Sequence, residues 1–514
     1  MRALLIYPIL PPHILSFKKT MTRLDKKSSY PPVGLMTVAA LLPSTWEIKL
    51  VDANIREVTD DDWLWAEIVL ISAMIPQKQD FHQHIKQAKR HHKTVVIGGP
   101  YPTALPEEAA SSGADYLVLN EGEITIPLFL QGLENGDLQG IYQSSQKPDV
   151  TKTPLPRYDL IDFKDYSSLS IQYSRGCPFL CEFCDIITLY GRKPRVKTPE
   201  QMMAEFDLIY NLGWRGVVSV IDDNFIGNKR QVKSFLLLLK QWMLDKQYPF
   251  ALITEASLDL ALEQELMDLM IECNFKGLFV GIETPDEESL LLTKKSQNTH
   301  IPITESIDTL YKTGFTLIAG MIIGFDGEKQ GAGERIRQFL EITHIPIANF
   351  GILQALPTTA LWDRLEQEQR LLSDTGDGMA TKPMNFKPSR PAEQIISEYI
   401  DANWQLYEPE AYLKRLYTHC LAVTIVQNGA WKELSPAEKK RRLAPLNKRS
   451  LYFLLSIFGR YGFISEARLD FWGYLFKLAF QKPVAVLPFL INCAFLEDLE
   501  AYRQFIRQQM QSFT

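Results

Sequence analysis

Short apolar runs alternate with helical stretches along the first two thirds of the chain, and this alternation restricts the fold more than any other feature. In residues 1–134 the helical stretches are Gly34–Leu42, Gln77–His91 and Leu105–Ser112. The predicted strands are Ala3–Tyr7, Glu47–Val51, Ile68–Ser72, Thr94–Ile97 and Tyr116–Leu119. Strands that are separated by helices lie parallel in a sheet. This part is therefore predicted to be an α/β domain with a doubly wound parallel sheet, whose ligands bind at the carboxyl ends of its strands.

The same alternation resumes after residues 135–170, which are rich in proline and polar side chains and are predicted to be a linker. The predicted strands that follow are Ile171–Tyr173, Val217–Ile221, Ala251–Thr254, Gly277–Gly281, Thr316–Ile323 and Asn349–Leu353. Six βα units in residues 171–373 predict a partial (β/α)6 barrel, with its chemistry on the loops after the strands. A chain of 514 residues is long enough for a further domain. Residues 374–514 are predicted to form it from helices: Ala392–Tyr407, Glu410–Cys420, Leu451–Phe458, Arg468–Ala479 and Leu496–Met510.

Three of the six cysteines, Cys177, Cys181 and Cys184, lie in one short loop after the first predicted barrel strand. Four thiolates fill every iron of an iron–sulfur cube, and a closed zinc site also takes four ligands. With no fourth Cys or His nearby, the loop predicts a cube with one open iron that binds a substrate or cofactor. The alternative is three small residues packed in a corner. The other cysteines are scattered, which fits a reducing cytosol, so we expect a cytoplasmic protein.

The spacing Cys-x3-Cys-x2-Cys, with an aromatic residue before the last Cys, resembles the signature of the radical S-adenosylmethionine (SAM) enzymes. The resemblance implies that Cys177, Cys181 and Cys184 hold a 4Fe-4S cluster whose open iron chelates SAM. It implies reductive cleavage of SAM to methionine and a 5′-deoxyadenosyl radical, with Phe183 against the adenine. An electron donor such as flavodoxin or ferredoxin is then expected.

Acidic residues follow three of the predicted barrel strands. Asp222 and Asp223 are adjacent at a strand end, which is costly unless they face water, a cation or hydrogen-bond donors. The resemblance implies that this loop contacts the ammonium group of SAM, and which of the two acids makes the contact stays open. A solvated turn or helix cap is the alternative. The resemblance implies that Glu283 contacts the ribose of SAM. Glu255, after the third predicted strand, is a second polar candidate at the mouth of the barrel. A buried salt-bridge acid is the alternative for either.

The stretch Gly320-Met321-Ile322-Ile323-Gly324 resembles the superfamily strand that lines the adenine. The resemblance places Gly320 and Gly324 there, and it places Gln354 on the neighbouring loop. Any buried strand that ends in glycine looks similar, so the order relative to the cysteines carries this assignment.

An α/β sheet before a radical SAM barrel resembles the cobalamin-dependent branch of the superfamily. The resemblance implies that cobalamin lies along the carboxyl edge of the first sheet, where Ser72, Gly98, Gly99 and Glu121 are found. Gly98-Gly99 permits close approach of a bulky ligand, although a tight turn explains it equally well. The chain lacks the Asp-x-His-x-x-Gly motif that places a histidine on cobalt, and His13 is expected to be an ordinary surface residue.

The segments Leu356–Trp362, Met384–Phe386 and Tyr407–Pro409 resemble the bacterial hopanoid C-2 methylase group. The implied reaction is methylation of an unactivated carbon in a small or lipidic substrate. Two alternatives remain open: a cobalamin-binding radical SAM enzyme that cyclises, oxidises or rearranges its substrate, and a catalytically silent cobalamin- or metal-responsive binding module. The apolar stretches Tyr452–Phe463 and Phe471–Phe495 suit a lipidic substrate or peripheral membrane contact, with packing against the barrel as the alternative.

Charge argues against nucleic acid as a partner. The chain has 55 Lys and Arg against 61 Asp and Glu, a net charge of −6, so bulk electrostatics does not favour a polyanion. The short apolar run at the N-terminus is typical of a first strand rather than a signal peptide.

Overall fold

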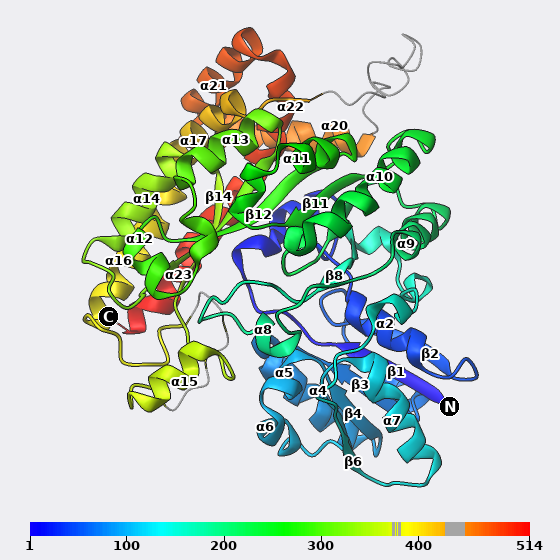
Figure 1. Ribbon diagram of the computed structural model, residues 1–514. Coiled ribbons are helices and arrows are strands. Elements are labelled where there is room, and N and C mark those ends of the chain that lie inside the picture. The colour runs from blue at the N-terminus through cyan, green and yellow to red at the C-terminus, as the bar shows by residue number, and fades with distance from the viewer. Residues whose placement is uncertain (373–375, 377, 379–381, 427–447, 514) are drawn as a thin grey trace.

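Two parallel β-sheets of six strands each organise the molecule (Figure 1). The structure is a computed structural model, and it describes residues 1–372, 376, 378, 382–426 and 448–513. The cysteine loop and α8 (Ile186–Leu189) lie between the two sheets in the view of Figure 1. The predicted α/β class is confirmed, with a doubly wound domain, a partial barrel and a helical C-terminal region.

The N-terminal sheet has the strand order β2-β1-β3-β4-β5-β6, and every pair is parallel. Its strands are β1 (Arg2–Tyr7), β2 (Glu47–Asp52), β3 (Ile68–Ser72), β4 (Thr94–Gly98), β5 (Tyr116–Val118) and β6 (Gly140–Tyr142). Alternate side chains of β1 enter different cores: Leu4 and Ile6 pack with α4, whereas Ala3 and Leu5 pack with α2 and α7. Burial on both faces explains the apolar runs of β1, β3, β4 and β5, whereas the edge strand β2 has Glu47 and Lys49 exposed. The helices are α2 (Val33–Leu41), α3 (Asp60–Trp65), α4 (Lys78–Arg90), α5 (Pro100–Ala104), α6 (Pro106–Ala110) and α7 (Gly122–Glu134).

The predicted linker needs one correction. Residues 140–142 form β6, which pairs with β5 at the edge of the N-terminal sheet. The strand has only three residues, and its central Ile141 is exposed, so it lacks the buried apolar run by which the other strands were recognised. The first barrel strand also begins earlier than predicted, at Ser168.

The barrel sheet has the order β14-β13-β12-β11-β10-β7, again parallel throughout. Its strands are β7 (Ser168–Ile171), β10 (Val217–Val220), β11 (Ala251–Glu255), β12 (Phe275–Glu283), β13 (Thr316–Ile323) and β14 (Ile347–Ile352). Five of the six predicted strands are confirmed with small shifts at their ends, and the first, predicted at Ile171–Tyr173, shares only Ile171 with β7. Its helices are α9 (Pro199–Asn211), α10 (Lys229–Asp245), α11 (Gln264–Glu272), α12 (Glu287–Leu292), α13 (Ile303–Thr313), α14 (Ala332–Ile342) and α15 (Ala360–Gln367). Because the strands are parallel, their carboxyl ends form one edge, which carries the cysteine loop and the predicted acids.

The C-terminal region is helical, as predicted, although the proposed boundary at Asp374 lies outside the described residues. Its helices are α16 (Ala392–Leu406), α17 (Pro409–Ala422), α20 (Lys448–Ile457), α21 (Arg468–Gln481), α22 (Val486–Cys493) and α23 (Leu496–Met510). The sequence prediction missed α22, whose apolar composition merges with that of its neighbours. Among the described helices, each is too short or too polar to cross a bilayer.

The segment between β1 and α2 connects the N-terminal domain to the C-terminal helices. The short helix α1 (Lys18–Arg23) packs on α23, where the Thr20 hydroxyl donates to Asp498 at 2.7 Å. The rings of Phe17 and Phe495 lie 4.4 Å apart. His13, expected at the surface, is half-buried in this segment, and burial lowers the pKa of its imidazole.

Candidate active site

The cysteine loop runs from β8 (Ser174–Arg175) to α8, and its backbone is shaped by glycine. Gly176 has a φ of 95°, and a Cβ there would lie 2.7 Å from the carbonyl oxygen of Gly191. Only glycine fits this position. The tight turn brings Cys177 to the carboxyl end of the barrel, followed by the largely buried Cys181 and the partly buried Cys184.

Each of the three cysteine sulfurs accepts a hydrogen bond. Backbone N–H groups of Phe179 and Ile186 donate to Cys177 and Cys184, and the side-chain amide of Gln297 donates to Cys181 Sγ at 3.6 Å. Such donors stabilise negative charge on sulfur, which is how proteins hold and tune iron–sulfur clusters. The residues present therefore fit a thiolate-bound cluster.

The spacing of the thiols favours a cluster over a single ion. In the described part of the chain, no three Cys, His or acidic side chains come close enough to hold one metal ion. An iron–sulfur cube does not need three ligands around one ion, because each thiolate binds a different iron. Burial raises the pKa of the Cys177 and Cys184 thiols, so bound cations are needed to keep them ionised.

Lys295 stands beside the cysteine loop, and sequence reasoning missed it. Its ammonium pairs with Glu283 and lies 5.8 Å from the centre of the Phe183 ring. Burial lowers the pKa of Lys295, but the charges of Glu283 and the cysteine thiols outweigh this and raise it. Glu283 has a φ of 69°, an uncommon value for a residue with a side chain. Two predicted residues, Phe183 and Glu283, thus meet around one buried cation. This ion pair is the buried salt bridge that was the alternative for Glu283, and its contact with ribose stays a prediction.

Asp222 and Asp223 face the backbone that leads into the cysteines. Asp222 accepts from the Tyr173 N–H at 2.7 Å and from the Ser174 hydroxyl at 2.6 Å, and Asp223 accepts from the Gly176 N–H at 3.0 Å. Burial raises the pKa of Asp222 to about 7 and that of Asp223 to about 6, despite these donors. Asp222 is fully engaged in positioning the loop, which leaves Asp223 as the better candidate for contact with a ligand cation.

Glu255 ends β11 and adds a third acid to this edge. Its side chain is open to solvent, yet the protein around it removes enough water to raise its pKa to about 8. The charges of Asp223 and Asp222 add to the rise. No salt-bridge partner appears for Glu255 among the ion pairs of the described residues, so the structure does not favour the alternative of a buried salt-bridge acid.

These three carboxyl groups give the cofactor-free protein a defined pH dependence. Each binds a proton more tightly in the folded chain than in the unfolded chain, so the free energy of unfolding should fall as pH rises through about 6, 7 and 8. We expect Glu255→Gln to flatten the upper part of this fall. Urea unfolding at a series of pH values measures the free energy of unfolding. A free energy that rises between pH 6 and 8 would contradict these pKa shifts.

The residues predicted to line the adenine of SAM are Gly320, Gly324 and Gln354, and the structure engages them in contacts within the protein. Gly324 has a φ of 105°, and its N–H donates to Glu328 at 2.9 Å, whereas Gly320 packs with the Phe279 ring. Gln354 is buried, and its amide group accepts from the Gly378 N–H at 3.0 Å and donates to the Lys382 carbonyl. The Gln354 amide therefore braces the segment after α15, and its contact with adenine stays a prediction.

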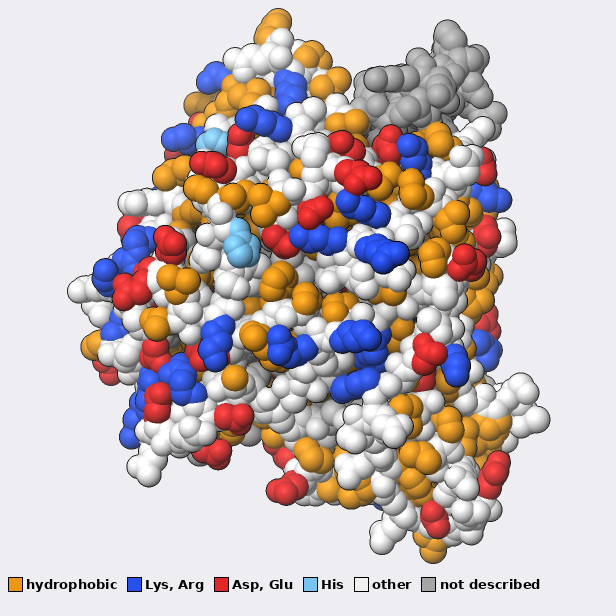
Figure 2. Space-filling view, in the orientation of Figure 1, with side chains coloured by type: hydrophobic (Ala, Val, Ile, Leu, Met, Phe, Trp, Pro, Cys, Tyr) orange, Lys and Arg blue, Asp and Glu red, His pale blue; other side chains and the backbone are white. Residues whose placement is uncertain are grey.

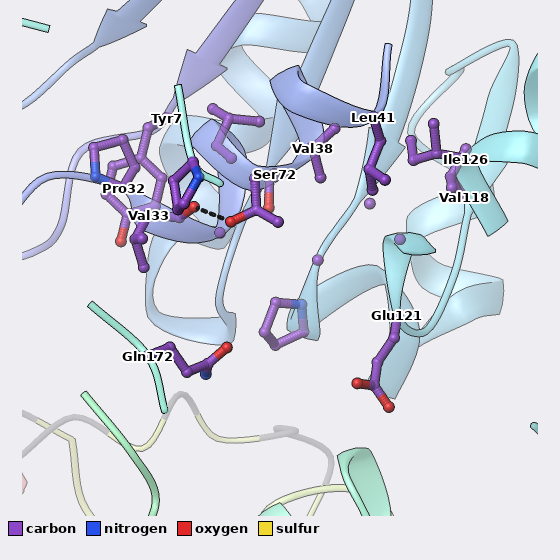
Figure 3. Close-up of a pocket in the computed structure, with 18 of the residues that line it drawn as sticks. Tyr7, Pro32, Val33, Val38, Leu41, Ser72, Val118, Glu121, Ile126 and Gln172 are labelled. Atoms are coloured by element: carbon purple, nitrogen blue, oxygen red, sulfur yellow. Dashed lines mark hydrogen bonds between the residues drawn. The ribbon is translucent and has the colours of Figure 1, made fainter. Parts of the chain in front are cut away.

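A cavity of about 440 Å³ separates the two sheets. Its walls come from the carboxyl ends of the N-terminal strands, from α2 and α7, and from barrel residues that include Gln172 and Ile221. Figure 3 shows apolar side chains of the N-terminal domain at one end of the cavity, with Gln172 across from them. Among the described residues that line it, none is a histidine. The cavity is large, mostly apolar and shared by both domains, which suits a bulky ligand held between them.

The glycines at the edge of the first sheet shape this cavity. A Cβ on Gly98 would lie 2.7 Å from the Val118 carbonyl oxygen, and one on Gly99 would lie 2.6 Å from Ser72 Oγ. Gly99 also has a φ of 95°. The three predicted residues Ser72, Gly98 and Gly99 therefore come together at one wall, where the backbone itself lines the space and fits a large planar ligand.

Glu121 reaches the same cavity, but its carboxylate is already paired. Arg175 and Arg195 each donate to one Glu121 oxygen at 2.8 Å, and Arg175 also donates to Glu123 at 2.7 Å. The Glu121 side chain is only 4% exposed. This buried network joins the N-terminal sheet to the cysteine loop, so the geometry gives Glu121 an interdomain role beside its predicted ligand contact.

Comparison with known proteins identifies the families of both domains that form the site. Residues 171–340 match the Radical SAM superfamily, residues 23–130 match the B12 binding domain, and residues 359–512 match a domain of unknown function. The chain is 50% identical to an uncharacterised methyltransferase of Synechocystis sp., over 99% of this chain and 93% of the relative. It is 35% identical to the hopanoid C-2 methylase of Rhodopseudomonas palustris, over 93% of this chain and 89% of that one.

Solved structures share the fold. The cobalamin- and SAM-bound radical enzyme OxsB has a TM-score of 0.61 and 14% identity, covering 100% of this chain and 80% of that chain. The radical SAM methyltransferase TsrM of Kitasatospora setae, with cobalamin and a 4Fe-4S cluster, has a TM-score of 0.60 and 14% identity, covering 100% and 99%. The expected cofactors, a 4Fe-4S cluster, SAM and cobalamin, are thereby confirmed at the level of the family. The chain belongs to the cobalamin-binding radical SAM methyltransferases, in the group that contains the hopanoid C-2 methylase.

Proposed function

We propose that the protein methylates an unactivated carbon of a small or lipidic, hopanoid-like substrate. The observation that carries the proposal is the shared cavity between the sheets. The carboxyl ends of both parallel sheets line it, with Gly98 on one side and Gln172 and Ile221 on the other. Two cofactors bound at these two edges would face one another across the space in which a substrate lies.

Three groups of residues would hold the cofactors. Cys177, Cys181 and Cys184 would bind the cluster. Phe183, Asp223, Glu255 and Glu283, with the backbone at Gly320 and Gly324, would surround SAM. Ser72, Gly98 and Gly99 would lie against cobalamin. When bound, the cluster and SAM supply a carbon-centred radical, and cobalamin supplies the methyl group.

The chain's own residues bind, orient and exclude water. The Gly176 turn and the Asp222 hydrogen bonds fix the cysteine loop, and the ion pairs of Arg175 fix the distance between the domains. The apolar walls from α2 and α7 keep water away from a reactive carbon centre. No general base is needed for removal of a hydrogen atom, which agrees with a site that holds carboxylates and aromatic rings rather than a His–Asp pair.

The lipidic nature of the substrate is supported by the relative that acts on hopanoids and by apolar helices at the C-terminus. Such a substrate resides in membranes, so the protein works in the cytoplasm at the membrane surface. A one-electron donor such as flavodoxin or ferredoxin completes the reaction.

Product analysis tests the proposal. Protein reconstituted anaerobically with iron, sulfide and cobalamin, and given SAM, reductant and a lipid extract, should form 5′-deoxyadenosine and S-adenosylhomocysteine together. Mass spectrometry should show a lipid heavier by one methylene group, and the same lipid should disappear from cells that lack the protein. Formation of 5′-deoxyadenosine without coupled S-adenosylhomocysteine would replace methylation with a cyclisation, oxidation or rearrangement.

A further inference from the structure

Helix α21 is apolar on two opposite faces, and only one of them is covered. Phe471, Leu475 and Leu478 are buried against the neighbouring helices. On the outer side, Leu469 is 78% exposed and Phe480 is 87% exposed. Apolar helix faces are normally covered by protein or lie against a membrane, and no part of the chain that the structure describes covers the outer face of α21.

Ring contacts join the outer side of α21 to the short π-helix Phe458–Ile464 that precedes it. The Trp472 ring stacks on Phe476 at 5.6 Å and meets the edge of Phe463 at 6.1 Å. The docking face, as we define it, consists of six residues: Phe463, Ile464, Leu469, Trp472, Phe476 and Phe480. Phe463 and Ile464 are 71% and 68% exposed. Single exposed apolar residues are ordinary, but an adjoining group of aromatic and aliphatic side chains marks a contact site.

The charge around the docking face is basic. Arg468 and Lys477 are exposed beside Leu469 and Phe476, and residues 451–491 contain four basic and two acidic side chains, in a chain whose net charge is −6. Figure 2 shows orange and blue side chains together over the end of the molecule where α21 lies in Figure 1. Apolar and aromatic residues flanked by Lys and Arg are the composition that binds anionic membrane surfaces.

We propose that the docking face inserts into the interfacial layer of an anionic lipid bilayer and anchors the protein there. This inference rests on the proposed lipidic substrate for its purpose, but its evidence is the exposed surface itself. The lipid phosphates pair with Arg468 and Lys477, while Phe463, Leu469 and Phe480 enter the acyl boundary.

The shape of this end of the molecule favours a bilayer over a second copy of the chain. Helix α21 lies at the extremity of the molecule opposite the N-terminal domain (Figure 1), and on its outer face Leu469 and Phe480 are mostly exposed while Phe476 is 57% exposed. A convex end buries little area against a copy of itself, whereas it enters a soft lipid layer readily. The same orientation leaves the N-terminal domain away from the membrane.

Vesicle flotation tests the proposal. The full chain should float with vesicles made of equal parts phosphatidylcholine and phosphatidylglycerol, and less with phosphatidylcholine alone or at high salt. The double variant Leu469→Glu/Phe480→Glu should lose at least about tenfold in vesicle affinity, because two apolar contacts are removed. The matched control is Leu138→Glu/Ile342→Glu, which changes two exposed apolar residues (88% and 69% exposed) elsewhere and should float like the wild type.

Two results would overturn the proposal. One is a wild-type chain that stays unbound to anionic vesicles. The other is a dimer in analytical ultracentrifugation that the Leu469→Glu/Phe480→Glu change dissociates, which would assign the face to a second copy. Failure of methylation is distinguishable from both, because flotation requires no cofactor, and the double variant should still methylate a detergent-dispersed substrate if the proposed function is right.

Discussion

Changing Cys177, Cys181 or Cys184 to alanine is expected to abolish reductive cleavage of SAM. Each change removes one thiolate from a cluster that has only three protein ligands. The expected result is loss of 5′-deoxyadenosine formation below detection in anaerobically reconstituted protein, measured by chromatography after addition of SAM and reductant.

Cys273→Ala provides the matched control. Cys273 is also buried and free, but it lies in the core behind α10, where its thiol contacts the Leu236 carbonyl oxygen. Its removal should cost about 1 kcal/mol of stability and leave SAM cleavage intact. Activity that survives the loss of any one of the three loop cysteines would remove the proposed cluster from the mechanism.

The second large effect concerns the joint between the domains. Arg175→Met would leave Glu121 and Glu123 with less compensation in a buried site, because their side chains are only 4% and 10% exposed. Breaking a buried ion pair from one side costs about 3 kcal/mol or more in the free energy of unfolding. Urea unfolding of the cofactor-free protein measures the loss, and weaker cobalamin binding should accompany it because the cavity loses one wall.

Arg157→Met is the comparison for this prediction. Arg157 also pairs with an acid, Asp159, but both side chains are substantially exposed. Solvent screens such a pair, so the loss should stay below about 1 kcal/mol. Equal losses for Arg175→Met and Arg157→Met would show that the Arg175 network does not hold the domains together.

Most strands were predictable from the sequence because burial on both faces favours apolar residues along much of a strand. Of the twelve strands in the two six-stranded parallel sheets, eleven were located from short apolar runs, although β7 was located only at its last residue. The exception is β6, an edge strand with an exposed centre. Helix α22 was missed for a different reason: it is short and mostly apolar, so no helical period stands out within it against the apolar stretch Phe471–Phe495.

The candidate site was predictable only where one motif carries the chemistry. The cysteine spacing identified the cluster loop, and the order of the later strands placed Glu283 and Asp223 near it. Lys295 and Gln297 were missed because they lie more than a hundred residues further along the chain in an ordinary polar stretch, and only the folded barrel brings them to Cys181. A salt-bridge partner cannot be read from sequence order alone, which also explains why the pairing of Glu121 with Arg175 was not foreseen.

The proposed chemistry depends on three thiolates that hold a cube with one iron free to bind SAM. Mössbauer spectroscopy of the anaerobically reconstituted protein, recorded before and after addition of SAM, tests this most directly. A 4Fe-4S cluster is expected, in which the signal of a single iron changes on addition of SAM. A cysteine loop that carries zinc, or a cluster in which no iron responds to SAM, would contradict it.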